Sequence, residues 1–514
     1  SVTGGNITIP GNISVSNVYI SGIGNIPVSG NTMPVSGNIT VAGNVNANVT
    51  GSNVNANVTG GNVTVSGNVG ISTLPAISGN VNANITGGNV NAAVTGTVTA
   101  NQGTSPWVVS GNVNAAITSG NITASFGQGS IDAFGRLRVS EPYTLFDSAL
   151  NGERRNDFST SATGGGNVTF NFNANVRQLN VTSANGDSVI RESMNVFPYQ
   201  PGKSMLIMNS FVMNQPKTNL RQRIGFFTTN NGIYLEQNNT TKTMVIRSYS
   251  SGSVTEERVN QSSWNGDKLD GTGPSGITLD LTAPQILFTD IEWLGVGTVR
   301  VGFIINGQFI TCHYFNHANI NSFTTTYMST ATLPVRIEIT NTGATSGNST
   351  MQHVCSTVIS EGGYNNAYYT YFAGTDINTT RLVTAGTYYP IASVRLQSGY
   401  LNSIVTLHQV DILSPSVNYY RWVILKNATL TGATWASASS TTRTQADTAA
   451  TAVTGGSVVQ SGYASSRTTE TLSNDYYGTI GRTLAGVSDT YTLAIAATAN
   501  NADVLAQLGW QEIV

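Results

Sequence analysis

Two pairs of acidic residues have the spacing that sugar cleavage would need. Asp290 and Glu292 are separated by one residue, and Glu256 and Glu257 are adjacent. Glycoside hydrolysis uses two carboxyl groups roughly 5–10 Å apart that flank the scissile bond. Alternate residues of a β-strand face the same side, so Asp290 and Glu292 would meet that distance. Isolated acid pairs are also common on solvated strands, and no phosphate-binding loop or nucleophile-elbow sequence accompanies these. We therefore predict a protein that is not an enzyme.

Histidine and cysteine residues gather in two short segments, Cys312–His317 and His353–Cys355. Zinc would accept their nitrogen and sulfur atoms as ligands. Neither segment has Cys-x-x-Cys spacing, and we predict no metal and no cofactor. A zinc site built from Cys312, His353 and Cys355 remains an alternative, as does a disulfide between the two cysteines.

The first of these segments belongs to the clearest hairpin in the chain. Residues Val299–Phe315 contain two strand-like runs around Asn306-Gly307, a strong signal for a two-residue turn. That turn would pair Ile305 with Gln308, Phe303 with Ile310 and Val301 with Cys312. His313 would then lie opposite Arg300 on the other face, and Cys312 would be a small buried hydrophobic residue.

Aromatic residues in the last third of the chain could bind sugars, because aromatic rings stack on the apolar faces of pyranoses. The candidate contacts with a glycan or receptor are Tyr364, Tyr368, Tyr369, Trp422 and Trp435. Packing in a core or at a subunit interface is the favoured alternative, because a tyrosine hydroxyl can remain hydrated there.

The elements that must position these residues are β-strands. Apolar and polar residues alternate through Ile404–Ile412, Tyr419–Leu425 and the final run Val504, Ala506, Leu508 and Trp510. A second hairpin is expected from Leu333–Thr340 and Thr350–Ile359, and residues Ala436–Ala452 are expected to form a loop. No segment has helical periodicity, so we predict an all-β chain with jelly-roll-like sandwiches.

The N-terminal quarter differs from the rest, because the first charged residue of the chain is Asp132. Gly-Asn pairs, which are typical of turns, separate short runs such as Val45–Val49 that alternate aliphatic residues with Asn, Thr or Ser. Strands with so few and such small apolar side chains bury too little apolar area to fold as a single chain. We predict a repetitive oligomeric β shaft, with a single-chain solenoid and a disordered arm as alternatives.

These observations predict three domains: a shaft at residues 1–131, a β-sandwich at 132–362 and a C-terminal β domain at 363–514. Gly362-Gly363 supplies the second boundary. The net charge of −2 and the scarcity of Lys and Arg argue against a nucleic-acid partner. No apolar run is long enough for a membrane helix. The N-terminus shows no signal peptide, so we expect synthesis in a bacterial cytoplasm.

Several separated segments resemble virion proteins of bacteriophages, notably of marine and cyanobacterial phages. They are Ala133–Ser140, Leu145–Asp147, Trp293–Gly297, Tyr327-Met328 and Leu333-Pro334, which together span about residues 132–362. The resemblance implies a fibre, spike or other structural protein attached to the virion, and it carries over no functional residue.

The composition and the resemblance together predict a homotrimeric phage fibre. One end would attach to other virion proteins, and its β-sandwich knobs would contact the bacterial surface, with a surface glycan as a candidate partner. The alternatives are a head or neck decorating fibre without a receptor, and a tailspike enzyme that degrades glycan.

A first prediction concerns Asn46, Asn55 and Asn82, which separate inward-facing aliphatic residues of the shaft. Near a threefold axis an aspartate would meet two like charges, whereas asparagine can hydrogen-bond to its own copies. We expect each Asn→Asp variant to destabilise the trimer by a few kcal/mol, about the cost of burying a poorly paired charge. The measurement is the melting temperature of each variant, compared with that of the control variant Thr99→Asp. Equal, small shifts would mean that these asparagines face solvent.

Overall fold

The computed structural model describes residues 19–21, 40–42, 131, 142–148, 157–363, 367–415, 418–465, 467–472 and 478–513. The chain divides into two units, Ser1–Ile117 and Thr118–Val514. In the first unit, the described strands β1 (Tyr19–Ser21) and β2 (Thr40–Ala42) pair in parallel. The rest of the predicted shaft lies outside the described residues, including Asn46, Asn55 and Asn82.

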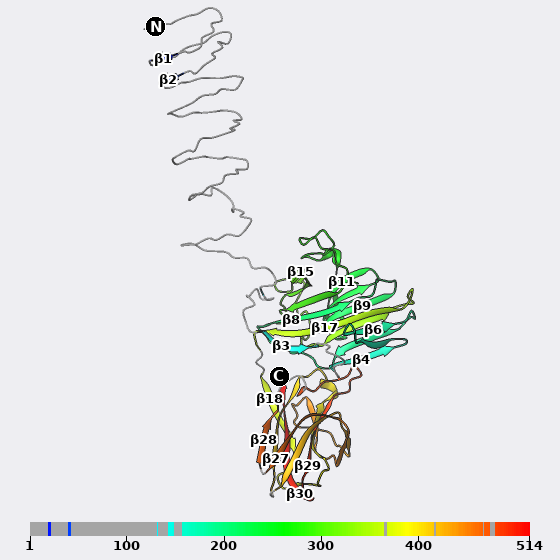
Figure 1. The fold of residues 1–514 in the computed structure, drawn as a ribbon, viewed down its shortest axis with the longest axis vertical. Coiled ribbons are helices and arrows are strands. Elements are labelled where there is room, and N and C mark those ends of the chain that lie inside the picture. Colours follow the sequence, from blue (N-terminus) through cyan, green and yellow to red (C-terminus); the bar gives the residue numbers. More distant parts are fainter. Residues whose placement is uncertain are drawn as a thin grey trace, which may run out of the picture. The chain divides into compact units, whose positions relative to one another are not determined.

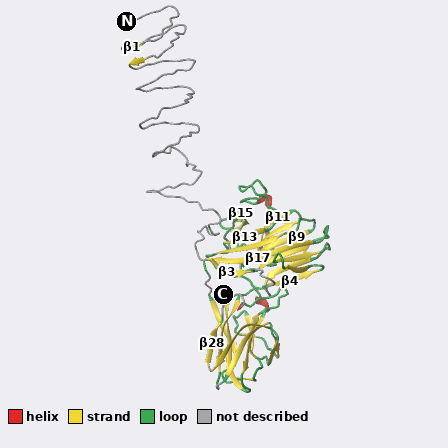
Figure 2. Ribbon diagram, in the orientation of Figure 1, coloured by secondary structure: helices red, strands yellow, loops and turns green. Residues whose placement is uncertain are grey.

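The second unit contains two β-sandwiches, drawn from cyan to yellow-green and from yellow to red in Figure 1. The all-β prediction is confirmed: the described helical segments are the single 3₁₀ turns η2 (Gln261–Ser263) and η3 (Ser398–Tyr400) (Figure 2). No described helix is long and apolar enough to cross a membrane.

The first sandwich packs a seven-stranded sheet against an eight-stranded sheet, and every strand pair in it is antiparallel. The seven-stranded sheet runs β12 (Thr255–Asn260), β11 (Thr241–Ser248), β10 (Gly232–Asn238), β9 (Leu220–Phe227), β16 (Val335–Asn341), β7 (Ser188–Ser193) and β4 (Phe158–Thr163). The eight-stranded sheet runs β15 (Gln308–Phe315), β14 (Val299–Ile305), β13 (Gln285–Ile291), β8 (Ser204–Val212), β17 (Ser349–Glu361), β6 (Val176–Val181) and β5 (Asn167–Asn171), with β3 (Pro142–Asp147) also paired to β17.

The second sandwich repeats this plan with smaller sheets. Its five-stranded sheet runs β18 (Tyr368–Gly374), β30 (Ala502–Ile513), β21 (Val405–Leu413) and β28 (Arg467–Thr471), with β19 (Arg381–Val383) also paired to β30. Its six-stranded sheet runs β24 (Ala436–Ser437), β25 (Thr444–Asp447), β20 (Tyr389–Leu396), β29 (Thr490–Ala497), β22 (Tyr419–Lys426) and β27 (Ser457–Ser465). The strands β23 (Thr429–Thr431) and β26 (Ala452–Thr454) form a separate pair.

Each sandwich has its own core between its two sheets. The first core extends in sequence from Phe146 to Val358 and the second from Val383 to Trp510. The first set of strands ends at Glu361 and the second begins at Tyr368, so the predicted boundary at residue 362 falls between them. The alternating residues Val504, Ala506, Leu508 and Trp510 all face the second core, as their period of two predicted.

The structure contradicts two of the predicted elements. The segments expected to pair as a hairpin, Leu333–Thr340 and Thr350–Ile359, form β16 and β17, which belong to opposite sheets. Ile337 and Met351 both lie in the first core, so the two strands meet face to face and not edge to edge. The expected loop Ala436–Ala452 contains the short strands β24 and β25, which extend the six-stranded sheet beyond β20.

The hairpin around Asn306-Gly307 is present, with both turn residues at positive φ. Ile305 pairs with Gln308 and Phe303 with Ile310, as predicted. A β-bulge between Val301 and Gly302 then shifts the register. Val301 lies opposite His313 and Arg300 lies opposite Tyr314, so the predicted pairs of Val301 with Cys312 and of Arg300 with His313 are wrong. Cys312 is nevertheless fully buried in the first core.

This bulged hairpin generates a stability prediction at Gly302. A Cβ atom added there would lie 2.0 Å from the carbonyl oxygen of Ile310 and 2.8 Å from the ring of Phe288. We expect Gly302→Ala to lower the free energy of unfolding by about 3 kcal/mol, because the backbone itself must move.

The matched control is Gly307→Ala in the turn of the same hairpin. The space around Gly307 is open, and its φ of +74° is the only obstacle to a side chain. We expect a cost of about 1 kcal/mol there. Urea unfolding of both variants is the measurement, and a larger loss for Gly307→Ala would contradict the described register.

Candidate functional site

The two carboxylates of the first predicted acid pair have different surroundings in the structure. Asp290 in β13 is fully buried and forms an ion pair with Arg300 of the neighbouring strand β14. Glu292 follows the end of β13, and its carboxylate accepts a hydrogen bond from the backbone N–H of Thr298 at 3.3 Å. Asp290 is therefore buried and bound to Arg300, whereas Glu292 lies just beyond the end of the strand.

The second acid pair divides across strand β12. Glu256 lies opposite Arg247 of β11, and Glu257 lies opposite Ile246. Because Ile246 belongs to the first core, Glu256 faces the other way, onto the outer face of the seven-stranded sheet. Glu257 instead lies 3.5 Å from Nε2 of His317. Glu256 and Glu257 thus face opposite sides of β12, and Asp290 of the first pair is buried and bound to Arg300.

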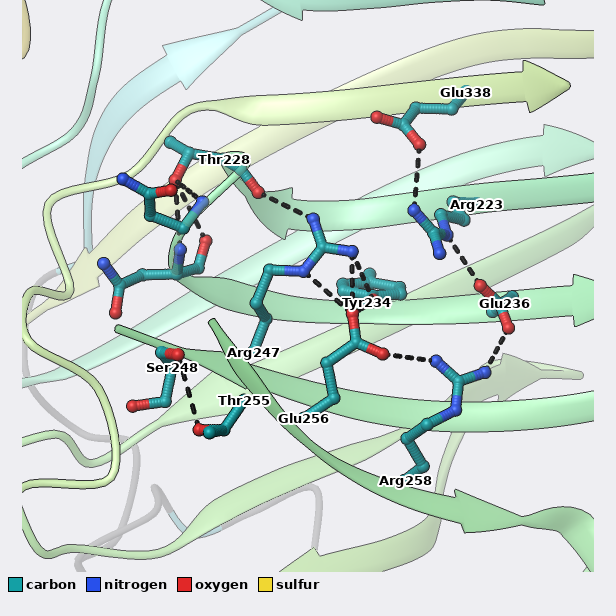
Figure 3. Close-up of polar contacts among 12 residues, drawn as sticks. Arg223, Thr228, Tyr234, Glu236, Arg247, Ser248, Thr255, Glu256, Arg258 and Glu338 are labelled. Carbon is teal, nitrogen blue, oxygen red and sulfur yellow. Dashed lines mark hydrogen bonds and ion pairs between the residues drawn. The ribbon is translucent and has the colours of Figure 1, made fainter. Parts of the chain in front are cut away.

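Glu256 belongs to a line of alternating charges that crosses the outer face of the seven-stranded sheet (Figure 3). We call this line the charge ladder. Its members on the sheet are Arg247, Glu256, Arg258, Glu236, Arg223, Glu338, Arg336 and Glu192.

Glutamates and arginines alternate along the ladder, so each carboxylate has at least one guanidinium partner. Glu236 lies between Arg258 and Arg223, and Nε of Arg223 donates to it at 2.6 Å. Glu338 likewise lies between Arg223 at 3.4 Å and Arg336 at 2.6 Å. Burial would be costly for any of these charges alone, and the pairing offsets that cost.

The arginines of the ladder also cover a small apolar cluster formed by Phe227, Tyr234 and Val245. The guanidinium of Arg223 lies 5.2 Å from the centroid of the Tyr234 ring, and that of Arg247 lies 5.1 Å from it. These are cation–π distances. All three members of the cluster are fully buried, although they lie on the face of the sheet that is turned away from the main core.

Tyr234 connects this cluster to Glu256. Its hydroxyl donates to Glu256 at 2.7 Å, and Nε of Arg247 donates to the same carboxylate at 2.9 Å (Figure 3). Burial alone would raise the pKa of Glu256, but the hydrogen bonds from Tyr234, Arg247 and Arg258 lower it from 4.5 to about 2. A general acid needs a raised pKa, so Glu256 is unsuited to protonate a leaving group.

The histidine and cysteine residues do not form a metal site. β15, which carries Cys312, and β17, which carries His353 and Cys355, are four strand spacings apart in the eight-stranded sheet, roughly 19 Å. Both cysteines are free thiols, and burial raises the pKa of each. Among the described residues, no group of three or more His, Cys, Asp or Glu side chains is placed to hold a metal ion.

His353 takes part in a buried polar chain that the sequence did not reveal. Its Nε2 lies 2.8 Å from the hydroxyl of Ser356, which donates to Oδ1 of Asn209 at 2.7 Å. A β-bulge between His353 and Cys355 brings His353 and Ser356 together. All three side chains are buried, and burial lowers the pKa of His353 to about 3. A neutral histidine out of reach of substrate has a structural role here.

The four described residues among the predicted aromatic contacts differ in burial and in the direction they face. Tyr364 lies outside the described residues. Trp422 is 4% exposed in the second core, so no ligand can reach its ring. Trp435 is half-buried, with the guanidinium of Arg395 4.1 Å from its ring centroid. Tyr368 and Tyr369 are both exposed, but as neighbours on β18 they point to opposite faces of the sheet.

Tyr368 lies on the outer face of the five-stranded sheet with Phe372, four residues further along β18. Phe372 is 42% exposed and pairs with Gly509 of β30. A Cβ atom at Gly509 would lie 2.7 Å from the Phe372 ring, so the glycine leaves space for the ring to lie across the strand. Phe372 is an exposed aromatic residue on this face that the sequence interpretation did not select.

The same face contains an open groove of about 290 Å³. It is lined by Thr375, Ile377, Asp411, Ile412, Leu413, Arg467, Thr468, Thr469, Leu505, Ala506 and Gln507. Its volume is close to the lower end of the range for small-molecule sites. Six of these residues are polar and five are apolar, so the groove is more polar than a typical small-molecule site. We call it the β21 groove.

The comparisons with known proteins give only distant structural similarities. No family model matches the chain, and no curated protein matches its sequence. Similar solved structures include a β-glucanase of Bacillus licheniformis, with 11% identity, a TM-score of 0.27, and coverage of 41% of this chain and 96% of the other. The CBM2 module of the evolved Dit of Lactobacillus casei BL23 phage J-1 has 6% identity, a TM-score of 0.29, and coverage of 44% and 98%. The carbohydrate recognition domain of Emp47p has 12% identity, a TM-score of 0.27, and coverage of 42% and 95%. TM-scores this low carry no information on the ligand or activity of this chain.

The depressed pKa of Glu256 predicts a pH dependence of stability. Because the folded pKa of about 2 lies below the unfolded value of 4.5, the stabilisation is fully present above about pH 4.5 and is lost as the pH falls through about 2. With an allowance for solvent screening, protonation of Glu256 should lower the free energy of unfolding by on the order of 2 kcal/mol.

The variant Glu256→Gln should remove this part of the pH dependence, whereas Glu257→Gln, on the opposite face of β12, should retain it. The measurement is the free energy of unfolding in urea at steps between about pH 5 and pH 2. Equal slopes for wild type and Glu256→Gln would show that the ladder does not hold this carboxylate ionised.

Proposed function

We propose that this protein is a structural fibre of a phage virion that attaches to the bacterial surface by binding glycan through its C-terminal sandwich. The observation that carries the binding proposal is the outer face of the five-stranded sheet, where the exposed rings of Tyr368 and Phe372 accompany the β21 groove. Exposed aromatic rings offer a stacking surface for sugars, and the polar residues that line the groove offer hydrogen bonds to sugar hydroxyl groups.

Binding is favoured over cleavage by the count of carboxylates in the groove. Of the described residues that line it, Asp411 is the only acidic one, and hydrolysis of a glycosidic bond requires two carboxyl groups. Hydrogen bonds and the charge of Arg467 lower the pKa of Asp411, although burial opposes this effect. An ionised Asp411 can accept hydrogen bonds but cannot serve as a general acid.

The fibre part of the proposal is supported by the sequence. Residues 1–131 carry no charge and repeat Gly-Asn turns between thin aliphatic runs, a pattern that favours association of identical chains. The segments between residues 132 and 362 resemble virion proteins. We therefore propose a homotrimer, assembled in the bacterial cytoplasm and held in the virion by other virion proteins.

The proposal predicts that purified full-length protein binds bacterial surface polysaccharides without shortening them. The assay is an array of capsular, O-antigen and teichoic-acid glycans, together with a measurement of reducing ends released from each glycan that binds. Release of reducing ends by the wild type would favour a glycan-degrading spike instead.

Within this assay, Phe372→Ala should weaken binding about fivefold, since loss of a stacked aromatic ring costs about 1 kcal/mol. Tyr369→Ala is the matched control, because Tyr369 is 63% exposed on the same strand but faces the other way. Equal losses in both variants would mean that the outer face is not the binding surface.

A further inference from the structure

The side chains of the β21 groove form cross-strand rows on the outer face of the five-stranded sheet. The first row runs Phe372, Gly509, Gln409 and Thr471. The second runs Gly374, Gln507, Asp411 and Thr469. The third runs Leu505, Leu413 and Arg467. A polar row therefore lies between an exposed aromatic ring and an aliphatic pair.

Asp411 is the centre of the polar row. The side-chain amides of Gln409 and Gln507 donate to its Oδ2 at 2.9 and 2.7 Å. The hydroxyl of Thr469 also hydrogen-bonds to this carboxylate. Both amide bonds go to one oxygen, and a carboxylate offers about four acceptor positions. The carboxylate is thus held in a fixed orientation and can still accept a hydrogen bond from a ligand.

The aliphatic row supplies a surface of a different kind. Leu413 is 45% exposed and Ile377, at the rim of the groove, is 82% exposed. Exposed apolar side chains next to an ordered carboxylate match the two sides of a pyranose ring, which has hydroxyl groups at its edge and C–H groups on its face. A purely apolar ligand would leave Asp411 without compensation for its lost hydration.

We infer that the β21 groove selects neutral hexose residues, with the Asp411 carboxylate accepting hydrogen bonds from the hydroxyl groups of the sugar and Leu413 contacting its C–H face. A uronic or sialic acid carboxylate placed against Asp411 would meet a like charge at short range. Arg467 lines the same groove, opposite Leu413, and its charge acts on Asp411. The Asp411 carboxylate therefore partly balances the one cation, among the described residues that line the groove, that could attract an acidic sugar.

The test uses full-length protein and pairs of soluble oligosaccharides that differ only in a neutral hexose or the corresponding uronic acid. Calorimetry should give a lower Kd for the neutral member of each pair. Asp411→Asn should raise the Kd for the neutral sugar roughly tenfold, because hydrogen bonds to a charged acceptor are lost. It should also reduce the ratio of the Kd for the acidic sugar to the Kd for the neutral sugar. A melting temperature close to that of the wild type would show that the variant is folded.

Two further variants separate charge from shape. Leu413→Thr should weaken binding of both sugars by a similar factor of about three to five, because it removes apolar contact and leaves the charge in place. Glu470→Gln, one residue from Thr469 on β28 and therefore on the opposite face, should change neither affinity nor discrimination.

The groove is part of the surface on which the proposed function rests, and the outcomes distinguish the two ideas. If no oligosaccharide binds the wild type, both the glycan-binding function and the inference are overturned. If glycans bind but acidic sugars are preferred, or Asp411→Asn keeps the wild-type discrimination, only the inference fails. If Leu413→Thr changes the mass of the oligomer in sedimentation, the groove is a contact between copies of the chain and the inference is also overturned.

Discussion

Burial of one face of each sheet against a partner sheet is the interaction on which the rest of this structure depends. Ile337 and Met351, for example, come from opposite sheets and are both fully buried in the first core, as Leu493 and Leu508 are in the second. Apolar burial of this kind is the main favourable term in folding. Because strand side chains alternate, each sheet also has an outer face, and the side chains on that face must either be covered by one another or remain exposed to solvent.

The two sandwiches accommodate that second face differently. In the seven-stranded sheet, arginines and glutamates pair with one another across the strands and cover Phe227, Tyr234 and Val245, so the face provides its own cover. In the five-stranded sheet, Gly374 and Gly509 have no side chain to cover the outer face. Phe372, Asp411 and Leu413 therefore remain accessible to solvent there. The first face has its charges neutralised internally, whereas the second can still offer groups to a ligand.

Much of the fold followed from the sequence, but less of the candidate site did. The alternating pattern identified the strands around Val405–Leu413 and at the C-terminus, and Asn306-Gly307 identified a hairpin turn. Of the aromatic candidates, Tyr368 lies on the face that contains the groove, whereas Trp422 is in the core. Asp411 and Gln507 were not selected, because they are 96 residues apart in sequence and become neighbours only through the pairing of β21 with β30.

The sequence by itself determined the all-β class, the uncharged N-terminal repeat and the hairpin at Asn306-Gly307, because these depend on composition, on a period of two within single strands and on local turn residues. The tertiary structure alone decided which strands that are distant in the chain become neighbours and where the register shifts. Bulges at Val301/Gly302, His353/Cys355 and Leu407/Gln409 each change which side chains share a face. No local pattern encodes a bulge or a pair between strands that are distant in the chain, since both are set by the fit between neighbouring strands. The charge ladder and the β21 groove are products of that fit.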